Sequence, residues 1–295
     1  MRPGQPAPDP SDPAYHIGLC DKEDVLAKAL VAKEQGMEIL LSFHYSDTWS
    51  DPKAQPIPAA WMGHSFEQMQ QDVRDHTIDV LQCLKDHGIT PKWAKIGNET
   101  ANGMLWNERD RVPIPEESLG HLELNPEQYA GFIKAGAEAA KSVFPDIITL
   151  VHPDSGFDQD LYDRNLGTLV KYGAEFDQVA MSLYPYWAAK EHDMNDADQE
   201  VISDCIENIK QVWDKFGKDC LIVETGFLDD PEHPEVLEEG RRQLARLLRE
   251  GRDNTDGHCK GVFYWEPESM PGGYQLGAFD KDAKPTVIMD AFMNY

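Results

Sequence analysis

The sequence predicts an α/β protein of the (β/α)8 TIM-barrel type, and three observations carry that prediction. Short apolar segments alternate with longer helical segments along most of the 295 residues, which is the order of β/α units on a parallel sheet. The apolar segments are mostly continuous, as in strands that are covered on both faces. Neither glycine-rich phosphate motif, GxGxxG or the Walker-type GxxxxGK, occurs in the chain, which disfavours a doubly wound nucleotide-binding fold.

Capping residues, glycines and prolines set the predicted helix boundaries. Asp21 is suited to cap the first helix and Gly36 to end it. Ser65 and Gln68 have the spacing of a capping box, and Pro126 suits the first turn of a later helix. The predicted helices are 21–35, 65–88, a segment that opens at 125, 159–171, 201–217, 234–249 and 285–293.

Apolar runs between these helices predict six strands. They lie at residues 38–43, 93–96, 147–151, 178–183, 220–223 and 261–264. A closed barrel of this type has eight strands, so the first two are expected to be lacking. We expect one barrel domain over residues 1–295, with the proline-rich residues 1–13 as an extended lead-in.

Charge and hydrophobicity narrow the possible partners. With 53 acidic and 27 basic residues the formal net charge is −26, and such a field repels nucleic-acid phosphates and anionic lipid. No stretch of about 18 uninterrupted apolar residues occurs, so no membrane span is expected. The five cysteines are scattered, and we expect small buried residues rather than disulfides or zinc ligands. A neutral or cationic partner is therefore favoured over nucleic acid or membrane.

Polar residues follow the carboxyl end of every predicted strand. The clusters are residues 44–49, 97–99, 152–154, 184–187, 224–226 and 265–268. In a parallel barrel these strand ends share one face, and the active sites of such barrels lie on that face. Six clusters of this kind predict an active site.

Two carboxylates in these clusters, Glu99 and Glu224, each stand just past an apolar strand. Hydrolysis of a glycosidic bond needs such a pair, one to protonate the leaving oxygen and one to attack the anomeric carbon. Asn98, directly before Glu99, has an amide suited to bond a sugar hydroxyl. The alternatives are a pair that includes Glu266, or glutamates that serve only as helix-cap or salt-bridge partners.

Tryptophans near the strand ends fit a carbohydrate cleft, because the apolar faces of sugars stack on such rings. They are Trp49, Trp61, Trp106, Trp187 and Trp265. The alternative for each is that it packs a loop onto the barrel rim. We expect Trp93 and Trp213 in the core.

His44 and His152 allow two interpretations. With Asp47 and Asp154 they would form a His/carboxylate metal site, but such sites usually begin with an HxH pair and none occurs here. Neutral histidines that bond a sugar or orient a glutamate are favoured. The acidic stretch 193–198 lacks the spacing of an EF-hand loop. No cofactor is expected to be required, while a structural calcium ion in a loop stays open.

These segments resemble glycoside hydrolase family 53, the arabinogalactan endo-β-1,4-galactanases. The similar segments are residues 44–52 with Gln55, Pro58 and Trp61, residues 97–99 with Gly103 and Trp106, and residues 184–187, 224–227 and 261–267. The resemblance runs from about Ser11 to the C-terminus. It implies a barrel enzyme that hydrolyses β-1,4-galactan, the side chain of type I arabinogalactan, with retention of configuration.

By this resemblance Glu99 is the general acid/base and Glu224 the nucleophile. The residues expected to line the sugar subsites are His44, Asp47, Trp49, Asn98, His152, Asp154, Tyr184, Trp187, Trp265 and Glu266. Family members usually carry Leu and Asn where this chain has Pro153 and Ser155, which is a departure in that subsite.

The start of the chain also departs from the family pattern. Family members have two strands and a helix ahead of the point where this chain begins, with an arginine close to the nucleophile. We therefore expect a shortened member with an open six-stranded sheet and impaired function. The resemblance implies an extracellular or periplasmic protein, although residues 1–13 lack the basic and then apolar pattern of a signal sequence.

Two alternative functions stay open on the sequence. One is another retaining β-1,4-glycanase of the same barrel clan, acting for example on mannan or glucan, which product analysis on a panel of glycans would separate. The other is a non-catalytic carbohydrate-binding protein with a degenerate barrel. The presence of both glutamates argues against the second alternative, and the missing strands argue for it.

Overall fold

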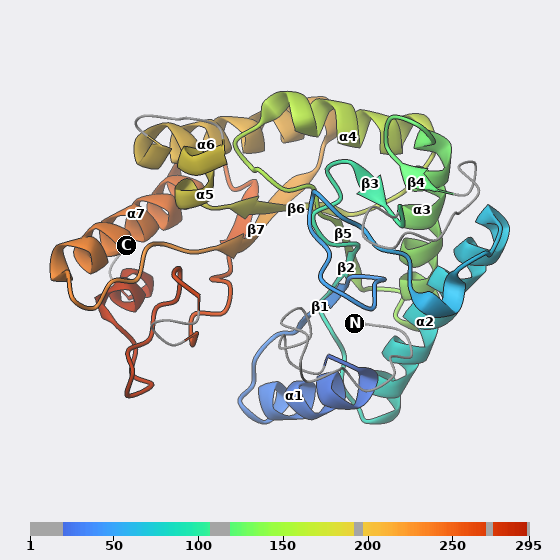
Figure 1. Ribbon diagram of the computed structural model, residues 1–295, viewed down its shortest axis with the longest axis horizontal. Helices are drawn as coiled ribbons and strands as arrows, with labels where there is room; N and C mark the ends of the chain where they lie inside the picture. Colours follow the sequence, from blue (N-terminus) through green and yellow to red (C-terminus); the bar gives the residue numbers. More distant parts are fainter. Residues whose placement is uncertain (1–19, 107–118, 192–196, 270–273, 294–295) are drawn as a thin grey trace. The chain divides into compact units, whose positions relative to one another are not determined.

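The main sheet has six strands, the number that the sequence predicts. The structure is a computed structural model that describes residues 20–106, 119–191, 197–269 and 274–293. In it the strands follow the order β1-β2-β5-β6-β7-β8 (Figure 1). The bounds are β1 Leu40–Phe43, β2 Trp93–Ile96, β5 Ile148–Val151, β6 Gln178–Leu183, β7 Asp219–Thr225 and β8 Cys259–Val262. The expected lead-in at residues 1–13 lies outside the described residues, as does most of the acidic stretch at 193–198.

Parallel pairing confirms the α/β class. β1 pairs with β2, β2 with β5, and β7 with β8, all in parallel. Leu40 lies opposite Trp93, and Trp93 lies opposite Ile148, so the first three strands are in register. Parallel neighbours need a crossover connection, and helices supply it here.

The helices of the described residues are α1 Lys22–Glu34, α2 Phe66–Asp86, α3 Pro126–Val143, α4 Gln159–Lys171, α5 Pro185–Glu191, α6 Ala197–Phe216 and α7 Pro234–Asp253, with 3-10 helices η2 Ala59–Trp61 and η4 Val287–Phe292. Helices α1, α2 and α3 begin where their capping signals predict. The Asp21 carboxylate accepts from the N–H of Asp24 at 2.8 Å, and both hydrogen bonds of the Ser65–Gln68 capping box are present.

Several details differ from the sequence-based expectation. α5 was not expected, and a two-residue antiparallel ladder joins β3 Gly103–Met104 to β4 Gly120–His121. β8 begins and ends two residues earlier than predicted, and its register with β7 shifts between Cys220 and Ile222. Trp93 is buried as expected, but Trp213 is 40% exposed and stacks on His258 with ring centroids 3.7 Å apart.

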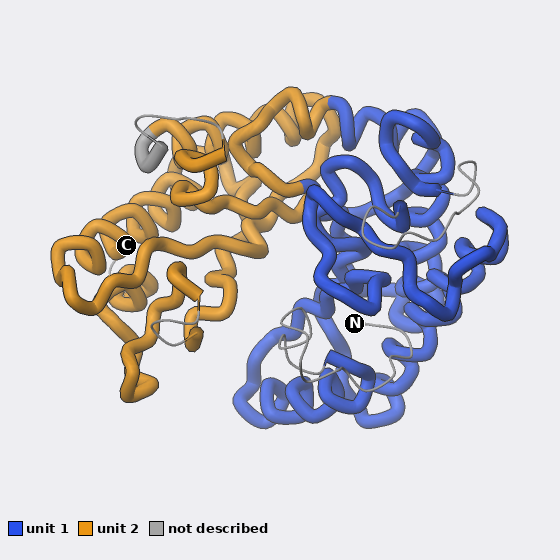
Figure 2. Tube along the Cα trace, viewed as in Figure 1, with its two compact units in different colours: residues 1–153, 164–178 blue, residues 154–163, 179–295 orange. Residues whose placement is uncertain are grey.

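The chain forms two compact units (Figure 2). The first comprises residues 1–153 and 164–178 and contains β1, β2 and β5. The second comprises residues 154–163 and 179–295 and contains β7 and β8. The single domain expected from the sequence stays a prediction, and each unit is described on its own below.

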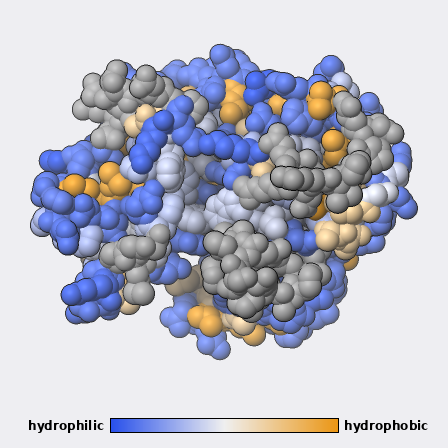
Figure 3. Space-filling model, in the orientation of Figure 1, coloured by the Kyte–Doolittle hydropathy of each residue, from blue (hydrophilic) through white to orange (hydrophobic). Residues whose placement is uncertain are grey.

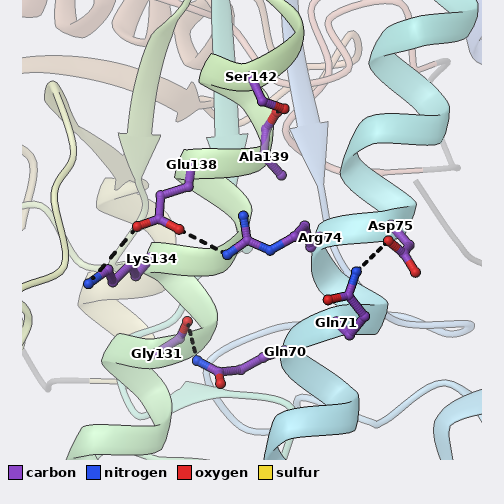
Figure 4. Close-up of polar contacts among 9 residues, drawn as sticks. All are labelled: Gln70, Gln71, Arg74, Asp75, Gly131, Lys134, Glu138, Ala139 and Ser142. Carbon is purple, nitrogen blue, oxygen red and sulfur yellow. Dashed lines mark hydrogen bonds and ion pairs between the residues drawn. The ribbon is translucent and has the colours of Figure 1, made fainter.

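Helices α2 and α3 pack against each other in the first unit (Figure 4). The rings of Phe66 and Phe132 meet edge to face with centroids 5.2 Å apart. A Cβ on Gly131 would lie 2.6 Å from the Phe66 ring, so a glycine permits this close approach. Arg74 pairs with Glu138 at 2.9 Å on the exposed side of the same interface.

In the second unit the apolar face of α6 is buried and packs against β7, while α7 packs against η4. Cys205 and Cys220 are buried there, and Cys259 is half-buried, as are Cys20 and Cys83 elsewhere. The expectation of buried cysteines therefore holds fully for two of the five.

Hydrophilic residues prevail on the face drawn in Figure 3, as a net charge of −26 leads one to expect. A few large apolar side chains of the described residues, Val31 and Val170 among them, are more than half exposed. Within the described residues, no helix has the length and apolar character that a membrane crossing requires.

Candidate active site

The turn that carries Glu99 follows β2 directly and has an unusual backbone. Gly97 has a φ of +84° and Glu99 a φ of +48°, both in the left-handed region. A Cβ on Gly97 would lie 2.6 Å from Cγ2 of Thr100, so this position favours glycine on two grounds. Glu99 is a non-glycine residue held in a strained conformation, and such strain concentrates at functional sites.

Hydrogen bonds from two other segments hold this turn. Nε2 of Gln55 donates to the main-chain oxygen of Asn98 at 2.8 Å. The N–H of Glu99 points to Nδ1 of His152 at 3.3 Å, and the N–H of Thr100 donates to the main-chain oxygen of His152 at 2.7 Å. The half-buried Glu99 is therefore fixed by residues that follow β1 and β5.

A buried lysine contacts the same turn. Lys95 is the third residue of β2 and is 2% exposed. Its Nζ donates to Oδ1 of Asn98 at 2.6 Å and to Nδ1 of His152 at 2.9 Å. Nδ2 of Asn98 in turn donates to the main-chain oxygen of Ser50 at 3.0 Å.

The imidazole of His152 is uncharged in this setting. Burial lowers its pKa well below the ordinary value of 6.5, and the charges of Lys95 and His44 act in the same direction. A neutral imidazole that accepts at Nδ1 carries its hydrogen on Nε2.

The predicted residues after β1 lie in the same unit. His44, Asp47 and Trp49 are half-buried. Oδ2 of Asp47 accepts from the N–H of Ala59 at 2.7 Å, so this carboxylate also holds the first turn of η2. The nearby Trp61, on η2, is 6% exposed and packs in the core, whereas the sequence predicted it in a carbohydrate cleft.

In the second unit, Glu224 lies beside a tyrosine from the end of β6. The hydroxyl of Tyr184 donates to Oε2 of Glu224 at 3.3 Å, and both side chains are half-buried. The next residue, Thr225, donates its hydroxyl to the main-chain oxygen of Leu183 at 2.6 Å. This bond ties the end of β7 to the end of β6.

Tyr274 joins the two tryptophans predicted for this unit. Nε1 of Trp187 donates to the hydroxyl of Tyr274 at 3.3 Å. The rings of Trp265 and Tyr274 meet edge to face, with centroids 4.9 Å apart and an interplanar angle of 80°. Trp187 lies on α5 and not in a loop as expected, while Glu266 is exposed beyond the end of β8.

Asp154 is a carboxyl group with an altered acidity. Burial raises its pKa to about 7, and the charges of Asp158 and Glu191 add to that effect. Oδ1 of Asp154 has no hydrogen-bond partner among the described residues. The loop that carries it is fixed by the hydroxyl of Tyr162, which donates to the main-chain oxygen of Asp154 at 2.8 Å.

Each unit thus gathers half of the residues that the sequence singled out. The first contains His44, Asp47, Trp49, Asn98, Glu99 and His152, and the second contains Asp154, Tyr184, Trp187, Glu224, Trp265 and Glu266. Sequence reasoning missed Lys95 and Tyr274. A charged residue inside an apolar strand was an available signal for Lys95, whereas Tyr274 lies away from any strand end.

Among the residues that the structure describes, no group of three or more His, Cys, Asp or Glu side chains is arranged to hold a metal ion. The expectation that no cofactor is required stays a prediction.

Parallel strands alternating with helices, with carboxylates at the strand ends, define the class of barrel glycosidases. The fold is similar to one of two fungal β-1,4-galactanases, with a TM-score of 0.78 and 22% identity over 97% of this chain and 85% of the other. The family 53 catalytic domain of Ignisphaera aggregans gives a TM-score of 0.76 with 26% identity, covering 92% and 78% of the two chains.

Sequence comparison identifies the family. Glycosyl hydrolase family 53 matches residues 6–286. An uncharacterized protein from the bgaB 5′ region of Niallia circulans is 35% identical over 276 residues, which are 86% of this chain and 70% of that protein. The probable arabinogalactan endo-β-1,4-galactanase A of Aspergillus terreus is 31% identical over 279 residues, 88% and 72% of the two chains. The chain belongs to glycosyl hydrolase family 53 and is a glycoside hydrolase.

Proposed function

We propose that this enzyme is a retaining endo-hydrolase of β-1,4-galactosidic bonds in galactan and type I arabinogalactan. The proposal is supported by the family membership and by the galactanase names of the Aspergillus relatives. The observation that carries it within the chain is that Glu99 and Glu224 stand at the carboxyl ends of β2 and β7. Retention requires two carboxyl groups about 5–5.5 Å apart, one as acid/base and one as nucleophile.

In the first step Glu99 protonates the glycosidic oxygen while the carboxylate of Glu224 attacks the anomeric carbon. The bond to the leaving chain breaks, and a galactosyl ester of Glu224 forms. In the second step Glu99 takes a proton from water, the oxygen of that water attacks the anomeric carbon, and Glu224 leaves as carboxylate. Tyr184 holds the carboxylate of Glu224 in one orientation through its 3.3 Å contact.

The remaining residues would bind a neutral polysaccharide. Trp187 and Trp265, linked through Tyr274, supply aromatic faces for sugar rings. Asp154, with a pKa of about 7, would be partly protonated near neutral pH and then able to donate to a sugar hydroxyl. No cofactor takes part in this chemistry, and an extracellular or periplasmic location fits a polymeric substrate.

The direct test is release of reducing ends from a panel of β-1,4-linked galactan, mannan, glucan and xylan. We expect galactan to be cleaved, with internal cuts that give oligosaccharides before monosaccharide. Cleavage of mannan or glucan in place of galactan would assign another glycanase specificity. Tight binding of galactan with no reducing ends released would instead assign a non-catalytic binding protein.

A further inference from the structure

We propose that Lys95 is a positioning residue of the hydrolytic site, whose ammonium group orients the Asn98 amide so that it presents an N–H donor to the sugar, and fixes the tautomer of the buried His152 beside it. The inference rests on the proposed function, because Asn98 directly precedes the acid/base candidate Glu99. It adds a residue that lies in the sheet itself and not in the loops after the strands.

The burial of Lys95 is the first step. The other residues of β2, Trp93, Ala94 and Ile96, are uncharged and buried, so an apolar side chain at position 95 would suit this strand equally well. Removing an ammonium group from water is costly unless good acceptors surround it. A charge retained at 2% exposure therefore points to a role beyond packing.

The orientation of Asn98 is the second step. Lysine has only donors, so the Asn98 atom at 2.6 Å from Nζ must be the amide oxygen. Nδ2 then uses one hydrogen on the main-chain oxygen of Ser50 at 3.0 Å. The second hydrogen of Nδ2 is left to donate to a sugar hydroxyl oxygen, whose own hydrogen can then be donated to a carboxylate.

The tautomer of His152 is the third step. Nδ1 receives the Lys95 ammonium at 2.9 Å and the N–H of Glu99 at 3.3 Å. Both are donors, so Nδ1 cannot carry a hydrogen and Nε2 must carry it. The same lysine thus fixes two side chains at the turn that carries Glu99.

The kinetic test compares Lys95→Met, which keeps the length of the side chain and removes its charge, with wild-type enzyme on β-1,4-galactan. We expect kcat to fall by about 30-fold or more and KM to change by less than about threefold, since a misdirected Asn98 loses contacts that strengthen in the transition state. Lys95→Gln retains an NH2 group with two N–H donors and should show a smaller loss. A Lys95→Met enzyme that keeps more than about a third of the wild-type kcat would overturn the inference.

The matched control is Lys92→Met, on the residue just before β2. Lys92 is 42% exposed and pairs with Glu38 at 2.6 Å, so its loss should leave kcat within about twofold of wild type. A double-mutant cycle with Asn98→Ala measures the coupling between Lys95 and Asn98 in kcat. A general destabilisation of the fold would not produce such a coupling. If Lys95 acts through Asn98, the double variant should be little slower than the slower single variant, whereas fully multiplied losses would contradict the coupling.

A measurement on the wild-type enzyme that needs no activity assay tests the premise that the hydrogen of the His152 ring is on Nε2. In 15N NMR of the histidine rings, we expect His152 to be neutral with its hydrogen on Nε2 at pH 6.5, where an ordinary histidine is half protonated, since burial, Lys95 and His44 all lower its pKa. A hydrogen on Nδ1 would overturn the inference even if every lysine variant failed to fold. Failure of wild type on galactan would overturn the proposed function and leave this readout intact.

Discussion

The hydroxyl of Tyr184, directly after β6, lies 3.3 Å from Oε2 of Glu224 near the end of β7. A neutral donor of this kind holds a carboxylate in place without removing its charge. Such an arrangement suits a group that must attack an electrophilic carbon, because it limits the orientations that the attacking oxygen samples. The contact therefore supports Glu224 as the nucleophile of the proposed mechanism.

Replacing this nucleophile should abolish turnover and allow chemical rescue. Glu224→Ala is expected to lose several orders of magnitude in kcat/KM, because the covalent step disappears. Azide should fill the vacated space and restore partial activity on an activated aryl galactoside, with an inverted glycosyl azide as the product. A variant that keeps more than about a tenth of the wild-type kcat/KM would rule out this role.

Loss of the acid/base residue should depend on the leaving group. Glu99→Gln is expected to slow hydrolysis of galactan far more than the first step on an aryl galactoside with a good leaving group, which needs little protonation. Steady-state and burst kinetics on both substrates would measure the difference. Equal losses on the two substrates would assign Glu99 a binding role.

The turn before Glu99 should not tolerate a side chain at its glycine. Gly97→Ala places a Cβ at a φ of +84° and 2.6 Å from Thr100, so we expect a loss of about 1–3 kcal/mol in the free energy of unfolding and a lower kcat. Gly167→Ala is the matched control, since Gly167 lies within α4 with nothing within 4 Å of its added Cβ. That variant should gain up to about 1 kcal/mol, and urea unfolding measures both. A Gly97→Ala enzyme with the wild-type free energy of unfolding and the wild-type kcat would contradict the conformation of this turn.

Asp154 should make stability fall as the pH rises toward neutrality. The pKa of Asp154 is about 7 in the folded protein, and the ordinary value of 3.8 applies to the unfolded chain. Between pH 3.8 and pH 7 the folded state therefore binds more protons than the unfolded state. The free energy of unfolding then decreases with increasing pH, by up to about 1.4 kcal/mol per pH unit from this group. Asp154→Asn removes that contribution, so its stability should decline less than wild type from about pH 5 to pH 7 in urea unfolding. Parallel profiles for the two proteins would show that Asp154 ionises normally.

Much of the fold follows from local sequence signals. The bounds of β2 and β6 match the apolar runs that predicted them, because helix-ending glycines and capping residues separate these runs from their neighbours. The helix at α5 was missed because residues after β6 were interpreted as a post-strand loop, although Pro185 suits the first turn of a helix.

Long-range contacts explain the remaining differences. The apolar helical pattern around Trp213 predicts a core position, yet its side chain is 40% exposed and its ring stacks on His258, which is far along the chain. Lys95 escaped notice because its acceptors are Asn98 and His152, and His152 comes from a different strand end. Sequence patterns identify which residues follow a strand. They do not show which of these residues contact a buried charged side chain such as Lys95.

The anomeric configuration of the first products from β-1,4-galactan, followed by 1H NMR with the wild-type enzyme, tests the proposed mechanism most directly. Two successive inversions at the anomeric carbon, first by Glu224 and then by water, predict that the β-anomer appears first and the α-anomer only by later mutarotation. An α-anomer as the first product would contradict the double displacement. Galactan left intact while another β-1,4-glycan is cleaved would contradict the substrate.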